Sequence, residues 1–189
     1  MPTRIASLNL FSTGPYIQNT TTWFENMVTR VQMFVPKSLD RSVTDAARML
    51  FTDTWLALPD DTKVPQPSTP DVVFPPSGEY KKFNSNYERF AAQELKKRTD
   101  PDIGFGKKGF MLQAIAAGWH YKSPEQLKEI ADKVGRERIA VVHGTRDNMI
   151  TLPHGEWLIK CLEPGVTEIR EGKGHVIMIE ETRWHNDCE

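Results

Sequence analysis

Two residues of the kinds used in acid–base catalysis follow strand-like segments in the carboxy-terminal third of the sequence. Asp147 comes shortly after the apolar run 139–142, and His175 comes shortly after the segment 166–170. An aspartate that accepts a hydrogen bond from one imidazole nitrogen leaves the other nitrogen available as a general base. The two residues could therefore serve as the acid and base of a nucleophilic triad, which also requires a nucleophile.

The segments that precede these residues are predicted to be neighbouring parallel strands. Residues 139–142 (IAVV) are continuously apolar, as is typical of a strand buried on both faces. Residues 166–170 (VTEIR) alternate in polarity and contain β-branched side chains. Parallel strands place their carboxyl ends at one edge of a sheet, where α/β proteins bind ligands. We therefore expect the loops of Asp147 and His175 to lie close together.

Helices are predicted around these strands, which gives the alternating order of an α/β fold. Ser123 precedes Pro124 and has Gln126 three residues later, the pattern of a capping box at a helix start. Gly135 is placed to end that helix. A second helix is predicted from Pro153, and a final one over 176–184.

The motifs around the two candidate residues resemble those of a known family. His143-Gly144-Thr145-Arg146-Asp147 and Gly172-Lys173-Gly174-His175 are similar to the acid and histidine motifs that close the α/β-hydrolase fold. In that family the order along the chain is nucleophile, acid, histidine, and the nucleophile lies in a G-x-S-x-G elbow. No G-x-S-x-G occurs in the 189 residues. The resemblance thus implies only the carboxy-terminal portion of a cap-bearing α/β hydrolase, truncated before the strand that opens this chain.

The resemblance also implies a division of the chain. The expected fold is a partial α/β-hydrolase fold with about three parallel strands plus a largely helical cap insertion. Residues 1–15 and 119–189 would form the partial core, and 16–118 the cap, with a proline-rich loop over 58–78. The first strand, over 4–10, would lack its other neighbour, and such an exposed edge could support self-association.

Four helices are predicted within the cap region from the spacing of apolar residues. They cover 23–35, a segment with Ser42 as its N-cap, 85–99 and 108–118. In the third helix Glu94 is placed on the solvated face.

The resemblance implies hydrolysis of a small ester, amide or related bond. His175 would be the general base and Asp147 the orienting acid, with a small, apolar substrate in a full-length parent and no cofactor or metal. The nucleophile could be Ser, Cys or Asp, so esterase, lactonase, epoxide-opening and dehalogenating chemistry all remain open. The alternative is a non-catalytic binding or interaction module.

The charge, apolar content and cysteines of the chain limit the binding partners and the cellular location that we expect. The chain has 24 basic and 25 acidic residues, so nothing favours nucleic acid or an anionic membrane. It also has no apolar run long enough to span a bilayer. Cys161 and Cys188 fit two free thiols, and we expect a cytoplasmic protein. The other histidines are expected to be structural or exposed, and His143 to be bound by backbone.

Overall fold

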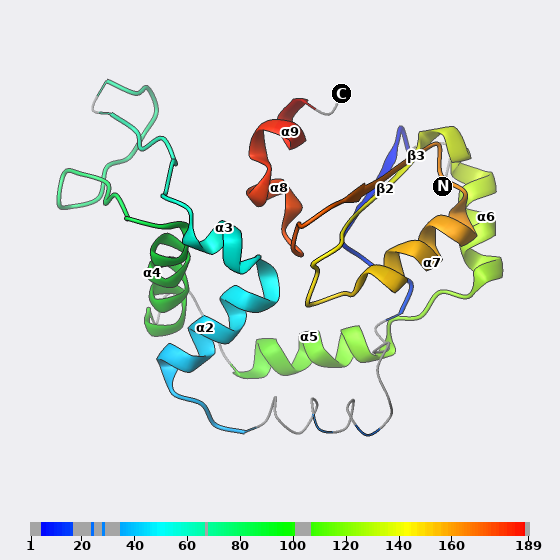
Figure 1. Ribbon diagram of the computed structural model, residues 1–189, viewed down its shortest axis with the longest axis horizontal. Helices are drawn as coiled ribbons and strands as arrows, with labels where there is room; N and C mark the ends of the chain where they lie inside the picture. The colour runs from blue at the N-terminus through cyan, green and yellow to red at the C-terminus, as the bar shows by residue number, and fades with distance from the viewer. Residues whose placement is uncertain are drawn as a thin grey trace.

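A computed structural model describes residues 5–16, 24, 28, 35–66, 68–100 and 107–187. Its sheet has three parallel strands in the order β1-β2-β3: β1 is Leu8–Phe11, β2 is Ile139–Gly144 and β3 is Val166–Arg170. Figure 1 shows this sheet flanked by helices, with a separate group of helices on the far side of α8 and α9. The predicted α/β class and the three parallel strands are confirmed.

Strand β1 is shorter than the predicted strand 4–10. Leu8 lies opposite Ile139, the first residue of β2, so the residues before Leu8 have no strand to pair with. The carbonyl of Ile5 instead accepts a hydrogen bond from Nη1 of Arg138 at 3.0 Å. Within the described part of the chain, β1 pairs only with β2, which leaves its other edge unpaired.

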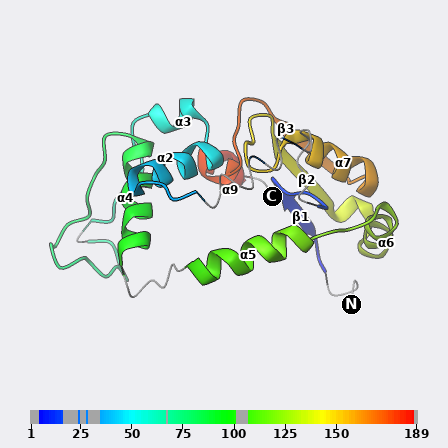
Figure 2. The ribbon, with the colours of Figure 1, turned by 90° about the horizontal axis from the view of Figure 1, so that it is seen from below.

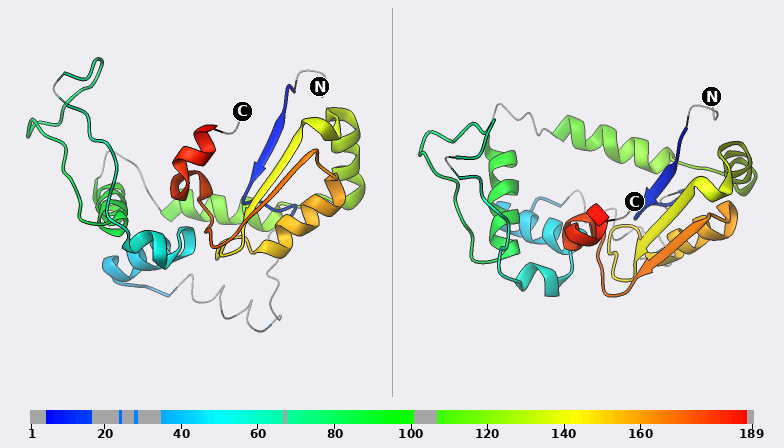
Figure 3. Two further views of the ribbon diagram at one scale, coloured as in Figure 1. Left: turned by 45° about the horizontal axis from the view of Figure 1, so that its top comes forward. Right: turned by 90° about the horizontal axis from the view of Figure 1, so that it is seen from above.

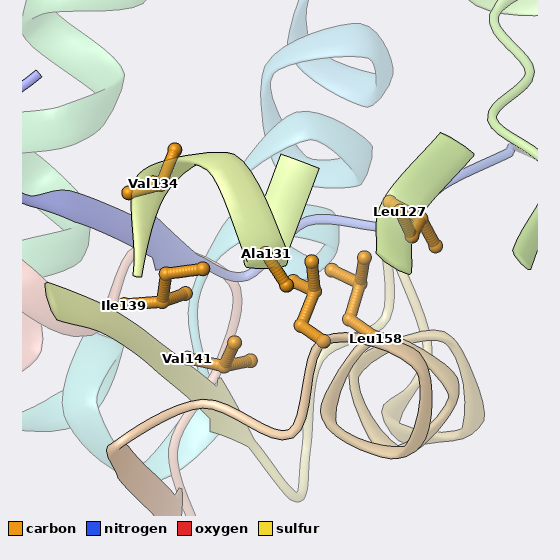
Figure 4. Packing of buried hydrophobic residues seen from close by; sticks show 7 residues of the cluster. Leu127, Ala131, Val134, Ile139, Val141 and Leu158 are labelled. Atoms are coloured by element: carbon orange, nitrogen blue, oxygen red, sulfur yellow. The ribbon is translucent and has the colours of Figure 1, made fainter. Parts of the chain in front are cut away.

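One face of the sheet packs against α6 (Pro124–Val134) and α7 (Leu152–Leu162). Figure 4 shows side chains from α6, β2 and α7 meeting in this core. Partly buried Leu8 and Leu10 of β1 pack against the same cluster. Burying these apolar surfaces is the main stabilising contribution to this half of the molecule. The buried residues of the cluster are Leu127, Ala131, Val134, Ile139, Val141, Leu158 and Leu162.

Both predicted boundaries of α6 are confirmed. The Ser123 side chain accepts from the Gln126 amide, and the Gln126 side chain accepts from the Ser123 amide, which completes the capping box. Gly135 follows the helix with a φ of 95°, a conformation that favours glycine. The start of α7 at Leu152, followed by Pro153, also agrees with the prediction.

The final helix is broken in two, contrary to the prediction of one helix over 176–184. Helix α8 is Ile177–Glu180 and α9 is Thr182–Asp187. Glu181 between them has φ −134° and ψ 53°, outside the helical region. Its carboxylate binds Arg170 at 2.7 Å on β3. The ion pair therefore joins β3 to the break between the two helices.

Between β1 and α6 the chain forms α2 (Leu39–Leu50), α3 (Asp53–Ala57), α4 (Asn86–Thr99) and α5 (Lys107–Trp119). The predicted helix over 23–35 lies almost wholly outside the described residues. Helices α4 and α5 agree with their predicted ranges. The proline-rich segment has no helix or strand at residues 58–66 and 68–85. In Figure 2 α5 runs from the α2–α4 group to the sheet.

Helix α2 begins earlier than predicted. Its N-cap is Ser38, whose Oγ accepts a hydrogen bond from the Arg41 amide at 3.2 Å, so Ser42 lies inside the helix. Pro36 and Lys37 precede this cap, and Asp40 in the first turn suits the helix dipole. The prediction of Ser42 as the cap was therefore wrong by one turn.

A second apolar cluster joins α2, α3 and α4, which Figure 3 shows grouped together. Its buried members are Ala47, Phe51 and Leu56, and the rings of Phe51 and Trp55 stack at 4.5 Å. Val176, which follows the candidate histidine, packs against this cluster. The α2–α4 group therefore contacts the carboxy-terminal part of the chain through apolar packing.

The prediction that Glu94 is solvated was wrong. Its residue surface is only 8% exposed, and its carboxylate pairs with Lys97 and with Arg98 at 3.1 Å. A carboxylate at a largely buried position is retained when charged partners compensate its desolvation. The sequence places these cations on the next turn of the helix, where they can reach Glu94.

Candidate functional site

The Asp147 carboxylate is fixed by backbone hydrogen bonds. Asp147 lies in the turn that follows β2, and its side chain is fully buried. Its Oδ1 atom accepts from the amides of Met149 and Ile150, both at 2.8 Å. These amides lie two and three residues further along the chain, so the turn itself orients the carboxylate. The second oxygen, Oδ2, is left to face another group.

That group is His175, which follows β3. Its Nδ1 lies 2.9 Å from Oδ2 of Asp147. An ionised carboxylate oxygen can only accept, so Nδ1 carries a proton, and in the neutral imidazole Nε2 then presents a lone pair. No hydrogen bond within the described part of the chain engages Nε2, and the His175 side chain is 20% exposed. The structure thus brings together the two residues that the sequence singled out.

The two loops are held together by backbone contacts that depend on glycine. The Arg146 amide donates to the Lys173 carbonyl at 2.8 Å, and the Gly172 amide donates to Thr145 Oγ1 at 2.9 Å. A Cβ atom at Gly144 would lie 2.3 Å from the Lys173 carbonyl oxygen, closer than any side chain allows. Gly144 in the first motif therefore permits the second motif to pack against it.

His143 lies buried against the loop that carries Asp147. It is fully buried, and its Nε2 donates to the Ile150 carbonyl at 2.7 Å. Nε2 is also 3.5 Å from Oδ2 of Asp147. The ring packs directly on Gly155 of α7, where a Cβ atom would come within 2.5 Å of Nδ1. The backbone contact agrees with the prediction for this residue.

The remaining histidines lie in other surroundings. His154 is buried and meets the Tyr16 ring edge to face, with centroids 5.4 Å apart. His185 makes the same kind of contact with Phe11 at 5.4 Å. His120 is exposed. Packing on aromatic rings accounts for the first two positions, as the structural reading of these histidines predicted.

The sequence reasoning missed the contacts that α2 makes with both loops. The Leu50 carbonyl, at the end of α2, accepts from the His175 amide at 2.9 Å. Asn148, next to the candidate acid, donates through Nδ2 to the Arg48 carbonyl at 3.0 Å. These pairs are a hundred or more residues apart in sequence, and carbonyl groups carry no residue-specific signal.

Two negative findings apply to the described residues. They include no group of three or more His, Cys, Asp or Glu side chains that could hold a metal ion. Their helices are also all too short or too polar to cross a membrane. Cys161 is a free thiol, and burial raises its pKa; Cys188 lies outside the described residues.

Comparison with known proteins identifies a fold but not a family. No family model matches the sequence. No curated protein matches it either. Among solved structures, the chain is similar to a candidate lipase (lip1) from Acinetobacter baumannii AYE, with a TM-score of 0.54 and 14% sequence identity.

The match covers 99% of this chain and 52% of the lipase chain, so the chain spans about half the length of that neighbour. At this identity the likeness concerns the fold alone. Together with the three parallel strands, it gives the chain an α/β fold similar to part of that neighbour.

Proposed function

We propose that this chain carries the acid and base of a hydrolase that cleaves a small ester, amide or related bond. His175 is the general base and Asp147 is the acid that orients it. Helices α2–α5 form a cap over an apolar substrate, in keeping with the division of the chain into a core at 1–15 and 119–189 and a cap at 16–118. The nucleophile comes from sequence outside these 189 residues, which contain no elbow motif.

The observation that carries this proposal is the hydrogen bond between His175 Nδ1 and Asp147 Oδ2, at 2.9 Å. It joins a fully buried carboxylate to an imidazole whose other nitrogen has no partner among the described residues. Both residues follow parallel strands at the carboxyl edge of the sheet, where α/β proteins carry out chemistry. A merely structural aspartate would not require an imidazole at the edge of solvent.

In this arrangement His175 transfers protons and Asp147 orients it, as in a nucleophilic triad. Nε2 of His175 removes the proton of the nucleophile, or of water, and later returns a proton to the leaving group. Asp147 keeps Nδ1 protonated and stabilises the imidazolium that forms in between. The Met149 and Ile150 amides hold the carboxylate in place throughout this cycle.

The test begins with the genomic sequence upstream of Met1. We expect an in-frame G-x-S-x-G, or an elbow with Asp at the same position. The extended protein should then hydrolyse a short p-nitrophenyl ester when the elbow carries Ser. His175→Ala should lower kcat by about 10³-fold or more, because the base is lost. His120→Ala, which changes an exposed histidine, is the matched control and should keep wild-type turnover.

Two results would contradict the proposal. One is a genomic sequence with no elbow upstream of Met1. The other is an extended enzyme in which His175→Ala turns over as fast as the His120→Ala control. The 189-residue chain itself should not be labelled stoichiometrically by a fluorophosphonate probe, since it has no elbow serine.

A second candidate function is supported by the exposed apolar surfaces of the chain. The outer edge of β1 is unpaired within the described region, and Trp119 of α5 is 82% exposed. These features favour an interaction module that self-associates through β1. Sedimentation velocity should then show a concentration-dependent dimer that Asn9→Lys, which adds a charge to the exposed side of β1, weakens. A monomer at all concentrations would exclude this function.

A further inference from the structure

The backbone of His175 is attached to the segment Leu50–Thr52, which we call the α2–α3 junction. The Leu50 carbonyl accepts from the His175 amide at 2.9 Å and from the Val176 amide at 3.2 Å. This carbonyl lies at the last residue of α2, where no further helical turn uses it. The location of the histidine backbone is therefore tied to the end of α2.

Glu180 makes a second connection between the same two segments. Its Oε1 atom accepts from the Thr52 amide at 2.7 Å and from the Thr52 hydroxyl at 3.2 Å. Its Oε2 atom accepts from the Gly174 amide at 3.3 Å. One carboxylate thus joins the α2–α3 junction to the residue directly before His175. Hydrogen bonds to a charged acceptor are among the stronger ones in proteins.

The fit between these groups is tight. A Cβ atom at Gly174 would lie 2.9 Å from Glu180 Oε1 and 2.9 Å from the Leu50 carbonyl oxygen. Glycine is thus required because two acceptors converge on its position. Val176 also packs against the cluster that contains Phe51, so apolar contacts reinforce the polar ones.

We propose that Glu180 is a positioning residue. It clamps residues 171–175, which we call the histidine loop, onto the α2–α3 junction and so keeps His175 in its hydrogen bond with Asp147. This inference rests on the proposed role of His175 as the base. Glu180 touches neither imidazole nitrogen in the described structure; it acts through the Gly174 amide and through Thr52.

Glu180→Gln in the 189-residue chain tests the clamp. The side-chain oxygen of glutamine can still accept from Thr52, but its NH₂ group cannot accept from the Gly174 amide. The matched control is Glu163→Gln, which removes the same charge from an exposed carboxylate that binds Arg136 at the end of α7 instead. Both variants are followed by amide hydrogen exchange and by ¹⁵N NMR of the imidazole.

In Glu180→Gln the His175 and Val176 amides should exchange about fivefold to tenfold faster, the effect of losing roughly one hydrogen bond. The imidazole Nδ1–H signal should also broaden through faster exchange. In Glu163→Gln both should match wild type. Amides of β2, such as Val142, report on the whole fold and should keep their protection in both variants.

Three results would overturn the inference. The first is wild-type exchange at His175 and Val176 in Glu180→Gln. The second is equal acceleration in the Glu163→Gln control. The third is acceleration that extends to Val142, since Glu180 would then stabilise the whole fold rather than the histidine loop. None of these measurements depends on turnover, so failure of the proposed catalytic role would be seen separately, in the His175→Ala kinetics.

Discussion

Replacing Asp147 separates the structural role of its carboxylate from its effect on His175. Oδ1 accepts from the amides of Met149 and Ile150, and Oδ2 accepts from His175. Asp147→Ala removes all of these bonds. Asp147→Asn keeps one carbonyl oxygen, which should face the two amides because that orientation satisfies more donors. The NH₂ group then faces Nδ1 of His175, a donor opposite a donor.

The expected losses of stability follow from these contacts. A hydrogen bond to a charged group contributes about 1.5–3 kcal/mol, and the amides here are only part-buried, which favours the lower end. Relief from burying a charge offsets part of this contribution. We therefore expect Asp147→Ala to lower the free energy of unfolding by about 2–4 kcal/mol and Asp147→Asn by about 1–2 kcal/mol.

Urea denaturation followed by circular dichroism measures both losses, with the midpoint compared at equal slope. A loss of about 3 kcal/mol is a large fraction of the 5–15 kcal/mol typical of a domain, so the two variants should be well resolved. If Asp147→Ala unfolded at the wild-type urea concentration, the Asp147 hydrogen bonds would not stabilise the fold as expected. The same would follow if Asp147→Asn were the less stable of the two variants.

Three further predictions concern other parts of the chain. Gly144→Ala should destabilise the fold by about 2 kcal/mol or more in urea denaturation, because its Cβ would lie 2.3 Å from a carbonyl oxygen of the histidine loop. Although burial raises the pKa of Asp60, hydrogen bonds at the carboxylate and the Arg89 cation hold that pKa below its ordinary value. An aspartate whose pKa is lower in the folded state than its unfolded value of about 3.9 stabilises the protein above that pH. Asp60→Asn should therefore lower the free energy of unfolding by its full amount at pH 7, and this loss should vanish as the pH falls through the folded pKa. Cys161, whose pKa is raised by burial, should react with iodoacetamide at pH 8 more slowly than free cysteine.

The sequence predicted those parts of the fold that rest on local patterns. The capping box of Ser123 and Gln126 placed the start of α6, because both hydrogen bonds form within one turn. The apolar run from Ile139 placed β2, because a strand buried on both faces has no polar alternation. Asp147 and His175 could be paired in advance, because adjacent parallel strands deliver their following loops to one edge of the sheet.

Other features depend on contacts between distant residues or on a choice between similar local signals. Ser38 and Ser42 are both capable helix caps, and only the backbone shows that Ser38 is used. Glu94 lies among charged residues, which suggested a solvated face, but its ion pairs allow it to be buried. Glu180 meets Thr52 across 128 residues of sequence. Such long-range pairing leaves no periodic pattern to read.

The tautomer of the His175 imidazole tests the assignment of Asp147 and His175 most directly, and long-range ¹H–¹⁵N NMR of the wild-type chain observes it. In the neutral ring we expect the proton on Nδ1 and a lone pair on Nε2, because the Asp147 carboxylate accepts from Nδ1. In Asp147→Asn the proton should move to Nε2, because the amide NH₂ then faces Nδ1. An Nε2–H tautomer in the wild-type protein, or the same tautomer in both proteins, would contradict the assignment of this pair as acid and base.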